Sequence, residues 1–370
     1  MQQFQQTLSE LKDQNRYRSL NLPVGIDLTS NDYMGMAVHP YLRSAAVEAL
    51  EDGLDIGAAG SRLLRGHTYS HENLESYTAT YFKAGGALYF ASGFQANYAL
   101  LTTLPDRRDV VLYDGLVHAS VRDGLIATQA KSYKFAHNDM DALEALLKRH
   151  RESAGTIWIA VESVYSMDGD LAPLVDLYAL AVRYDAMLIV DEAHATGIYG
   201  TDGKGLCWDI IDAHGYDHLV TLHTCGKAIG VAGGLVCASS NVIDYMVNKA
   251  RPFIFSTAPM PLQALLVQKS LEILASEDGA QRREKLFKIC ALGQKLFGGA
   301  GTQVIPIILG EDEKAVSVAK AMQEVGYDIR AIRPPTVPQG QARLRLSLSS
   351  ELEPAVLQGF ADALQPYMER

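Results

Sequence analysis

Apolar runs of strand length alternate with stretches of helical spacing over most of the chain. The runs that are typical of buried strands cover residues 87–91, 110–113, 156–162, 186–191 and 218–222. Strands that alternate with helices along a chain form parallel sheets with helices packed on their faces. The pattern therefore predicts an α/β fold with a mostly parallel central sheet.

The regions on either side of this alternation have patterns of their own. Residues 3–14 have helical spacing and residues 28–33 are extended, which together indicate an N-terminal arm. Residues 262–296 are helical without a strand signal. Strand-like runs follow at residues 304–309, 328–332 and 343–348, with helical stretches at residues 313–325 and from about residue 354. We expect an arm over residues 1–38, a large domain over 39–260, a helical connection over 261–296 and a small α/β domain over 297–370.

Composition and charge narrow the class of protein. Hydrophobic residues make up 48% of the 370 residues and charged residues 21%, which is typical of a folded globular chain and not of a disordered or fibrous one. The net charge of −10 repels a phosphate backbone, so we expect no nucleic acid partner. No run of 18 apolar residues occurs, so we expect no membrane partner either.

The cysteines indicate the compartment. They are Cys207, Cys225, Cys237 and Cys290. These four have neither the density of a disulfide scaffold nor the paired spacing of a zinc site. The first residues lack the basic and apolar segments of a secretory leader. We therefore expect a cytoplasmic protein.

Polar side chains close several of the predicted strands. Asp191 and His194 follow one strand, Glu162 ends another, and Lys227 comes shortly after a third. Because ligands bind beyond the carboxyl ends of parallel strands, we expect these groups to meet at one edge of the sheet. Lys227 stands among glycines and small residues, and a lysine in dry surroundings can act as an amine nucleophile. A solvated surface lysine is the alternative for Lys227.

Residues 88–97 have the pattern of a strand, a tight turn and a helix. Ser92 and Gly93 form the turn. A glycine there lets backbone N–H groups approach a ligand, and the N-terminus of the helix favours an anion such as phosphate. An ordinary turn with Ser92 as the N-cap explains the same residues.

Two familiar motifs are incomplete here. The residues Asp-Glu-Ala-His at 191–194 match the box of helicase ATPases, but the chain has no phosphate loop of the form G-x-x-x-x-G-K-[ST]. His67 and His71 are four residues apart, but His71 does not begin a zincin motif, so the start of a capped helix is the better interpretation. We predict no metal site.

Taken together, the motifs of this chain resemble the α-oxoamine synthases, which are pyridoxal-phosphate enzymes with the aspartate-aminotransferase fold, fold type I. The resemblance covers nearly the whole chain and is carried by residues 30–35, 60–62, 92–97, 118–120, 162–170, 191–197, 224–228 and 255–257. Residues 135–139, 331–338 and 342–346 resemble one branch of that family, which joins L-alanine to a pimeloyl thioester in biotin biosynthesis.

The resemblance implies a cofactor, pyridoxal 5'-phosphate (PLP), and a role for each matching residue. Lys227 is expected to bind PLP covalently and to act as the acid and base at the substrate Cα. Asp191 is expected to pair with the pyridinium nitrogen, and His118 to stack on the ring. The other expected contacts to PLP come from Ser92, Gly93, Phe94, Glu162, Ser166, His194 and Thr224, and from Ser256 and Thr257 of a second subunit.

The same resemblance implies substrate contacts. Arg345 is expected to grip the amino-acid carboxylate as a planar two-pronged donor. The further substrate contacts are expected from Asn31, His118, Thr336 and Arg18, with Arg16 as the alternative to Arg18. The chain departs from the family in a shortened segment between Arg18 and residue 30, in a glycine-poorer stretch at residues 57–60, and in Glu192, where the family commonly has aspartate.

The resemblance therefore implies a homodimeric acyltransferase that forms a carbon–carbon bond and releases carbon dioxide. Its substrates would be L-alanine and either pimeloyl-CoA or pimeloyl-acyl-carrier protein. Sister enzymes that use glycine or serine, or shorter or longer acyl chains, remain the alternatives, together with a non-catalytic partner subunit that keeps only the fold.

Overall fold

The computed structural model describes residues 2–368 and divides into two compact units. We call residues 34–166 and 171–283 the large unit, and residues 2–33, 167–170 and 284–368 the small unit. The sequence analysis expected each domain to be one continuous stretch of the chain. Instead, each unit is assembled from segments that are separated in the sequence by segments of the other unit. The N-terminal segment belongs to the small unit because β1 (Ile26–Asp27) pairs in parallel with β10 (Tyr327–Asp328).

The large unit is built on a seven-stranded sheet. Its strands are β2 (Gly86–Phe90), β3 (Val110–Asp114), β4 (Lys131–Phe135), β5 (Ile157–Glu162), β6 (Ala186–Asp191), β7 (Leu219–Thr224) and β8 (Gly234–Ala238). They lie in the order β2-β8-β7-β6-β5-β3-β4, and β8 alone runs antiparallel to both of its neighbours. The prediction of a mostly parallel sheet is confirmed. The edge strand β4 and the short β8 were not predicted, because β4 is largely polar and β8 follows a glycine-rich turn.

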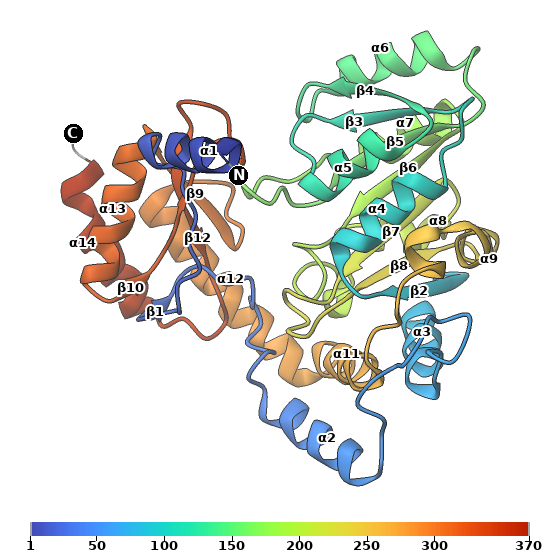
Figure 1. Ribbon diagram of the computed structural model, residues 1–370, viewed down its shortest axis with the longest axis horizontal. Coiled ribbons are helices and arrows are strands. Elements are labelled where there is room, and N and C mark those ends of the chain that lie inside the picture. Colours follow the sequence, from blue (N-terminus) through green and yellow to red (C-terminus); the bar gives the residue numbers. More distant parts are fainter. Residues whose placement is uncertain (1, 369–370) are drawn as a thin grey trace. The chain divides into compact units, whose positions relative to one another are not determined.

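Helices of the large unit pack against this sheet and against one another (Figure 1). They are α2 (Pro40–Glu51), α3 (Tyr69–Tyr81), α4 (Gly93–Thr103), α5 (Ala119–Ala127), α6 (Met140–His150), α7 (Leu174–Arg183), the 3-10 helix η1 (Thr201–Gly203), α8 (Trp208–His214), α9 (Ser240–Lys249), α10 (Arg251–Ile254) and α11 (Pro261–Leu274). One core joins α4 and α5 to the sheet, with Ala96 and Leu100 of α4 packed in the same cluster as Ile189 and Val220. Burial of such apolar surface stabilises the fold by roughly 25 cal/mol per Å².

The helical region expected over residues 262–296 is two helices, α11 and α12 (Glu277–Phe297). A new helix begins after Ser276, whose carbonyl oxygen accepts the Ala280 N–H. Glu277 and Asp278 lie in its first turn, where negative charge stabilises the helix dipole. The expected single helical region is therefore divided into two helices, because a new helix begins at Glu277 while the apolar spacing continues.

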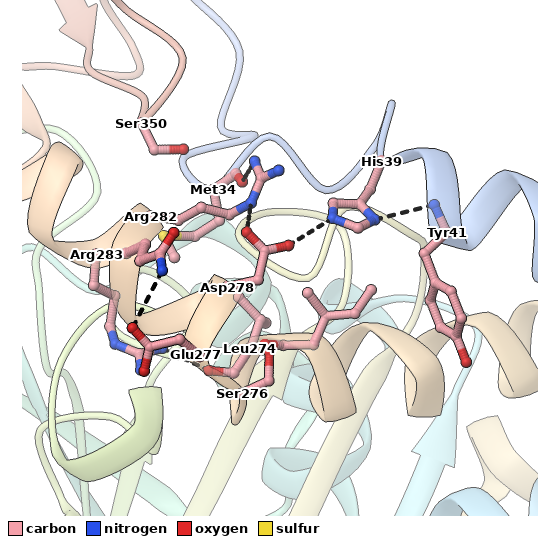
Figure 2. A network of polar contacts seen from close by, with 12 residues as sticks. Met34, His39, Tyr41, Leu274, Ser276, Glu277, Asp278, Arg282, Arg283 and Ser350 are labelled. Carbon is pink, nitrogen blue, oxygen red and sulfur yellow. Dashed lines mark hydrogen bonds and ion pairs between the residues drawn. The ribbon is translucent and has the colours of Figure 1, made fainter.

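A polar network joins the start of α12 to the segment before α2 (Figure 2). Asp278 Oδ2 is 2.9 Å from His39 Nε2, and Asp278 Oδ1 accepts from Arg282 Nε at 3.0 Å. Arg282 Nη1 in turn donates to the Met34 carbonyl oxygen. Burial by itself would raise the pKa of Asp278, but the His39 and Arg282 contacts outweigh it and hold that pKa below its usual value. The network thus fixes the backbone of residues 34–39.

The small unit contains two small sheets and three helices besides α12. Its helices are α1 (Gln2–Asp13), α13 (Asp312–Glu324) and α14 (Pro354–Met368). A three-stranded antiparallel sheet has the order β11-β12-β9, with β9 at Val304–Gly310, β11 at Ala331–Ile332 and β12 at Ala342–Ser347. The single strand expected over residues 328–332 is wrong. β10 and β11 lie in different sheets, because residues 329 and 330 turn the chain between them.

Two sequence features have a simple structural outcome. His71 is the third residue of α3 and accepts from the Thr68 backbone N–H, so the prediction of a capped helix start is confirmed. All four cysteines are buried and none forms a disulfide.

Within residues 2–368, no helix combines the length and the apolar character that crossing a membrane requires.

Arg62 and Glu75 form an ion pair that holds the segment of residues 60–62 against α3 and β2. Arg62 is only 7% exposed, and its Nη1 and Nη2 donate to the two carboxylate oxygens of Glu75 at 3.0 and 2.8 Å. Glu75 also accepts from the Tyr89 N–H at 2.8 Å. A buried charge costs free energy when it loses its partner, so the two side chains depend on one another.

We expect Glu75→Leu to lower the free energy of unfolding by about 3 kcal/mol or more, because it leaves the Arg62 guanidinium buried without a counter-charge. The double variant Arg62→Met/Glu75→Leu should lose less than the sum of the two single variants. Urea unfolding of all four proteins measures this coupling, with Glu72→Gln on the exposed side of α3 as the control. Strict additivity would show that the pair is not coupled.

Candidate active site

Two carboxylates end neighbouring strands of the large unit. Glu162 of β5 and Asp191 of β6 are register partners at the carboxyl edge of the sheet, and both are buried. Asp191 Oδ1 accepts the Ala193 N–H at 2.9 Å, and Asp191 Oδ2 accepts from Asn97 Nδ2 at 2.7 Å. Each oxygen of Asp191 therefore has a donor of its own, which fixes the orientation of the carboxylate.

Glu162 is held differently. Its Oε2 accepts the Ser166 N–H at 3.0 Å, whereas its Oε1 is buried and has no hydrogen-bond partner within residues 2–368. Burial, reinforced by the neighbouring Asp191 charge, raises the pKa of Glu162 to about 8. The side chain therefore holds a proton at neutral pH and presents one polar atom that a ligand can satisfy.

Lys227 lies in a compact turn between β7 and β8. The turn is closed by the bonds from Cys225 N–H to Gly233 O and from Gly230 N–H to Lys227 O. Gly230 has a φ of +69°, and a Cβ there would lie 2.4 Å from the Ala37 nitrogen, so this turn requires glycine. Lys227 Nζ lies 2.6 Å from His194 Nε2, and Lys227 is half-buried rather than solvated.

The N-terminus of α4 forms a cradle beside β7. Ser92 is the N-cap, and its Oγ accepts the Gln95 N–H at 3.1 Å. A Cβ at Gly93 would lie only 2.9 Å from Thr224 Oγ1, so the lack of a side chain lets these two segments approach. The first N–H groups of a helix have no partner inside it and attract anions, which here concerns Gly93 and Phe94.

His118 is the N-cap of α5 and is exposed, so its ring is accessible to a ligand. Its Nδ1 accepts the Ser120 N–H at 3.2 Å and lies 2.8 Å from Ser120 Oγ. Because a backbone N–H can only donate, Nδ1 is an acceptor and the neutral ring carries its proton on Nε2. Desolvation of the ring by the surrounding protein lowers the pKa of His118, which favours this neutral form.

These groups fit the cofactor that the resemblance implies. The α4 cradle suits a phosphate, the ionisable Asp191 suits a protonated ring nitrogen, and Lys227 offers an amine. The unsatisfied Oε1 of Glu162 is a further place for a ligand contact. Among residues 2–368, no group of three or more His, Cys, Asp or Glu side chains is arranged to hold a metal ion.

Ser256 and Thr257 lie beside the same region of the large unit. Thr257 forms an isolated bridge with Ser61, and both Ser256 and Thr257 line a small cavity with Gln95 and Arg62. Thr257 is exposed and Ser256 is half-buried. Their contact with the phosphate of a second subunit stays a prediction.

Apart from His118, which lies in the large unit, the expected substrate residues belong to the small unit and form two sets of contacts. In the first, Arg345 Nη1 donates to Asn31 Oδ1 at 3.1 Å and to Ser347 Oγ at 2.8 Å. Arg345 Nη2 donates to the Tyr33 hydroxyl at 3.3 Å, and that hydroxyl donates to Asn31 Oδ1 at 2.7 Å. Arg345 is only 8% exposed, so its guanidinium is held in place by these neutral groups.

The second set is a pocket of about 250 Å³ lined by arginines and Thr336. Arg18 Nη2 donates to Thr336 Oγ1 at 3.4 Å, and Arg333 Nη1 donates to the Asn15 carbonyl oxygen. Arg16 Nε is paired with Asp312 at 2.7 Å, so its charge is compensated inside the protein. The arginine character of this pocket suits an anion.

Three contact residues were not assigned a role from the sequence. Asn97 and Ser120 lie within recognised motifs, but only the fold shows that Asn97 bridges Ser120 and Asp191. Tyr33 likewise lies within a recognised motif, residues 30–35, and meets Arg345 across 312 positions of the chain. Asn97 follows Gly93 by four residues, and residues four apart share a helix face. This spacing could have indicated that Asn97 lies on the same side of the helix as the expected phosphate site.

Comparison with known proteins identifies the family. The profile described as aminotransferase class I and II matches residues 23–364. The 8-amino-7-oxononanoate synthase of Chromobacterium violaceum is 41% identical, with 98% of each chain covered, and that of Geobacter sulfurreducens is 39% identical, with 94% of this chain and 95% of that one covered.

Solved structures agree with this assignment. Serine palmitoyltransferase from S. paucimobilis, in complex with PLP and myriocin, is 27% identical with a TM-score of 0.89, and covers 100% of this chain and 98% of its own. The 8-amino-7-oxononanoate synthase from Francisella tularensis is 25% identical with a TM-score of 0.79, over 93% of this chain and 98% of its own. The expected fold type I is thereby confirmed. The chain belongs to the class I and II aminotransferase family and, within it, to the family of the 8-amino-7-oxononanoate synthases.

Proposed function

We propose that this protein joins L-alanine to a pimeloyl thioester and releases carbon dioxide and the thiol, giving 8-amino-7-oxononanoate for biotin synthesis. The observation that carries the proposal is the amine of Lys227 beside His194, at the sheet edge that also carries the fixed Asp191 carboxylate. Relatives of this name align with the chain over almost its whole length. Glycine and serine synthases share such an edge, so the choice of L-alanine rests on those relatives.

The cofactor is PLP, which withdraws electrons from the bonds at the amino-acid Cα and so stabilises negative charge there. Asp191 keeps a proton on the ring nitrogen by pairing with it. Lys227 removes the proton from Cα through Nζ and later returns one. His118 would stack on the ring, and His194 and Ser166 would form hydrogen bonds to its oxygen. The N–H groups of the α4 cradle and Thr224 bind the phosphate.

Arg345 binds the carboxylate of the amino acid in this proposal. Its guanidinium is held in a fixed orientation by Asn31, Tyr33 and Ser347, and a guanidinium in a fixed orientation can bind a carboxylate through two parallel N–H donors. Asn31 then lines the amino-acid site from the same set of contacts. A planar two-pronged donor fixes the carboxylate orientation as well as its position, which a lysine would not do.

We assign the arginine pocket to the anionic end of the acyl chain. The charge of Arg16 is paired with Asp312, whereas Arg18 contacts the neutral Thr336 hydroxyl, which favours Arg18 over Arg16 as the substrate contact. A pimeloyl chain ends in a second carboxylate, and a guanidinium is well suited to bind it. Whether the thioester is carried on CoA or on a carrier protein depends on surface complementarity, and both donors stay within the proposal.

A second copy of the chain completes the proposed enzyme. Large apolar side chains are exposed along the segment that contains α2 and the residues after it. They are Val38, Tyr41, Val47, Leu50, Ile56, Leu63, Leu64 and Tyr69. Exposed apolar surface of this density is typical of a protein–protein contact. We propose that it is covered in a homodimer, in which Ser256 and Thr257 reach the neighbouring phosphate site, and that the dimer is cytoplasmic.

Lys227→Ala is expected to lower turnover at least about a thousandfold, since general acid–base catalysis by a positioned group is worth roughly 10² to 10⁴ and the covalent link to PLP is lost as well. The assay is thiol release from pimeloyl-CoA with L-alanine, with the product identified by mass. The matched control is Lys249→Ala on exposed α9. Comparable turnover by Lys227→Ala, or a preference for glycine, would contradict the proposal.

Arg18→Gln should lower kcat/KM for pimeloyl-CoA by about 10- to 100-fold, because a hydrogen bond to a charged group is worth roughly 1.5–3 kcal/mol. The same variant should leave kcat/KM for heptanoyl-CoA nearly unchanged, since that chain has the same length but no second carboxylate. Arg149→Gln on exposed α6 is the control. An equal loss with both donors would assign the pocket to the phosphates of CoA instead.

The stability of the apoprotein should report the proton on Glu162. The folded-state pKa of Glu162 is about 8, against an ordinary value of 4.5, so between these pH values the folded state holds a proton that the unfolded state has lost. The contribution of Glu162 to stability therefore declines as pH rises from about 5 to 8. Urea unfolding at several pH values should show that Glu162→Gln removes this decline, whereas Glu152→Gln at an exposed site keeps it. Identical profiles of unfolding free energy against pH for wild type and Glu162→Gln would rule out this contribution of Glu162.

A further inference from the structure

We propose that Asn97 is a positioning residue for the cofactor site, holding the Asp191 carboxylate in place and joining it through Ser120 to His118. The inference rests on the proposed function, because it assigns Asp191 to the ring nitrogen of PLP. The contacts that carry it all lie in the large unit.

The direction of each hydrogen bond follows from the chemistry of the groups. An ionised carboxylate only accepts, so the Asn97 amide must turn its Nδ2 toward Asp191 Oδ2, at 2.7 Å. The same Nδ2 donates its second proton to Ser120 Oγ at 3.0 Å. Ser120 is then free to donate its own hydroxyl proton to His118 Nδ1 at 2.8 Å. Asn97 therefore donates directly to Asp191 and is connected through Ser120 to His118, the two residues that we place against the cofactor.

The burial of Asn97 argues against a role in packing alone. Asn97 is 2% exposed, and its Oδ1 is buried without a hydrogen-bond partner within residues 2–368. Leaving a buried acceptor unsatisfied costs about 1–3 kcal/mol. Its neighbours on the buried face of α4, Ala96 and Leu100, are apolar, and an apolar side chain at position 97 would avoid that cost. The polar side chain is therefore explained by what Nδ2 does for Asp191.

The position of Asn97 on α4 gives one helix two functions. The N-terminus of α4, at Ser92 and Gly93, forms the phosphate cradle, and Asn97 lies about one turn further along on the same helix. The titratable groups that face Asp191 from other elements are Glu162 of β5, His118 before α5 and, as a positive charge, Lys227. Asn97 is the neutral donor in this set, so it orients Asp191 without changing the charge of the site.

The test measures PLP binding, which needs no substrate. Asn97→Ala apoprotein should fold with an unchanged circular dichroism spectrum and bind PLP at least about tenfold more weakly than wild type, because Asp191 loses one of its two donors. The visible absorbance of the bound cofactor should titrate at a different pH in the variant. Asn248→Ala, at an exposed position of α9, is the control and should bind PLP as wild type does. Wild-type affinity and an unchanged titration in Asn97→Ala would overturn the proposal.

Two further variants separate positioning from packing. Asn97→Asp keeps the shape of the side chain but places a second carboxyl group against Asp191, so its affinity for PLP should fall as pH rises, unlike that of wild type. A pH-independent affinity would count against the proposal, and this holds even where Asn97→Ala fails to fold. Ser120→Ala should change PLP affinity little, because Asn97 still holds Asp191 and the Ser120 N–H still fixes the His118 tautomer. A loss in Ser120→Ala equal to that in Asn97→Ala would place the effect at His118 and refute the role assigned to Asp191.

These readouts are independent of the reaction assigned to the enzyme. If the protein used a different amino acid or thioester, the PLP titrations of the Asn97 variants would be unaffected. If Asn97 had no positioning role, the alanine and pimeloyl-CoA assay of the wild type would still give its product.

Discussion

The structure of the proposed active site depends on fixing the orientation of the buried Asp191 carboxyl group. Removing a charge from water is costly unless donors surround it, and here the Ala193 N–H and Asn97 Nδ2 each bind one oxygen. Glu162, the next carboxyl along the sheet edge, has one oxygen without a donor, and burial together with the neighbouring Asp191 raises its pKa. Two similar groups on adjacent strands are thus held by different sets of donors.

The sheet brings these groups together because parallel strands end at a common edge. β5, β6 and β7 are consecutive in the sheet as well as in the chain, so Glu162 and Asp191 are register partners, and Thr224 lies two residues beyond Leu222, the partner of Asp191. The antiparallel β8 then returns from that edge, and the glycine-rich turn before it holds Lys227. The strands of the sheet therefore position the reactive side chains.

Much of the fold was predictable because burial leaves a clear pattern. The strand predicted at residues 186–191 has the same bounds as β6, because every position in it is apolar until the terminal aspartate. The pattern failed where burial was partial or the segment was short: β4 is polar because it is an edge strand, and residues 328–332 divide between two sheets. Long helices were recognised, but the helix start at Ser276 was not, because the apolar spacing continues across it.

The sequence by itself determined which chemistry is present, because motifs such as residues 191–197 and 224–228 carry the reactive groups within a few positions of one another. Only the tertiary structure decided which groups meet. Asn97 and Asp191 are 94 positions apart, Arg345 and Tyr33 are 312 apart, and Arg18 and Thr336 are 318 apart. Local spacing cannot encode such pairs, since they are set by the order of strands in a sheet and by the packing of a helix on it.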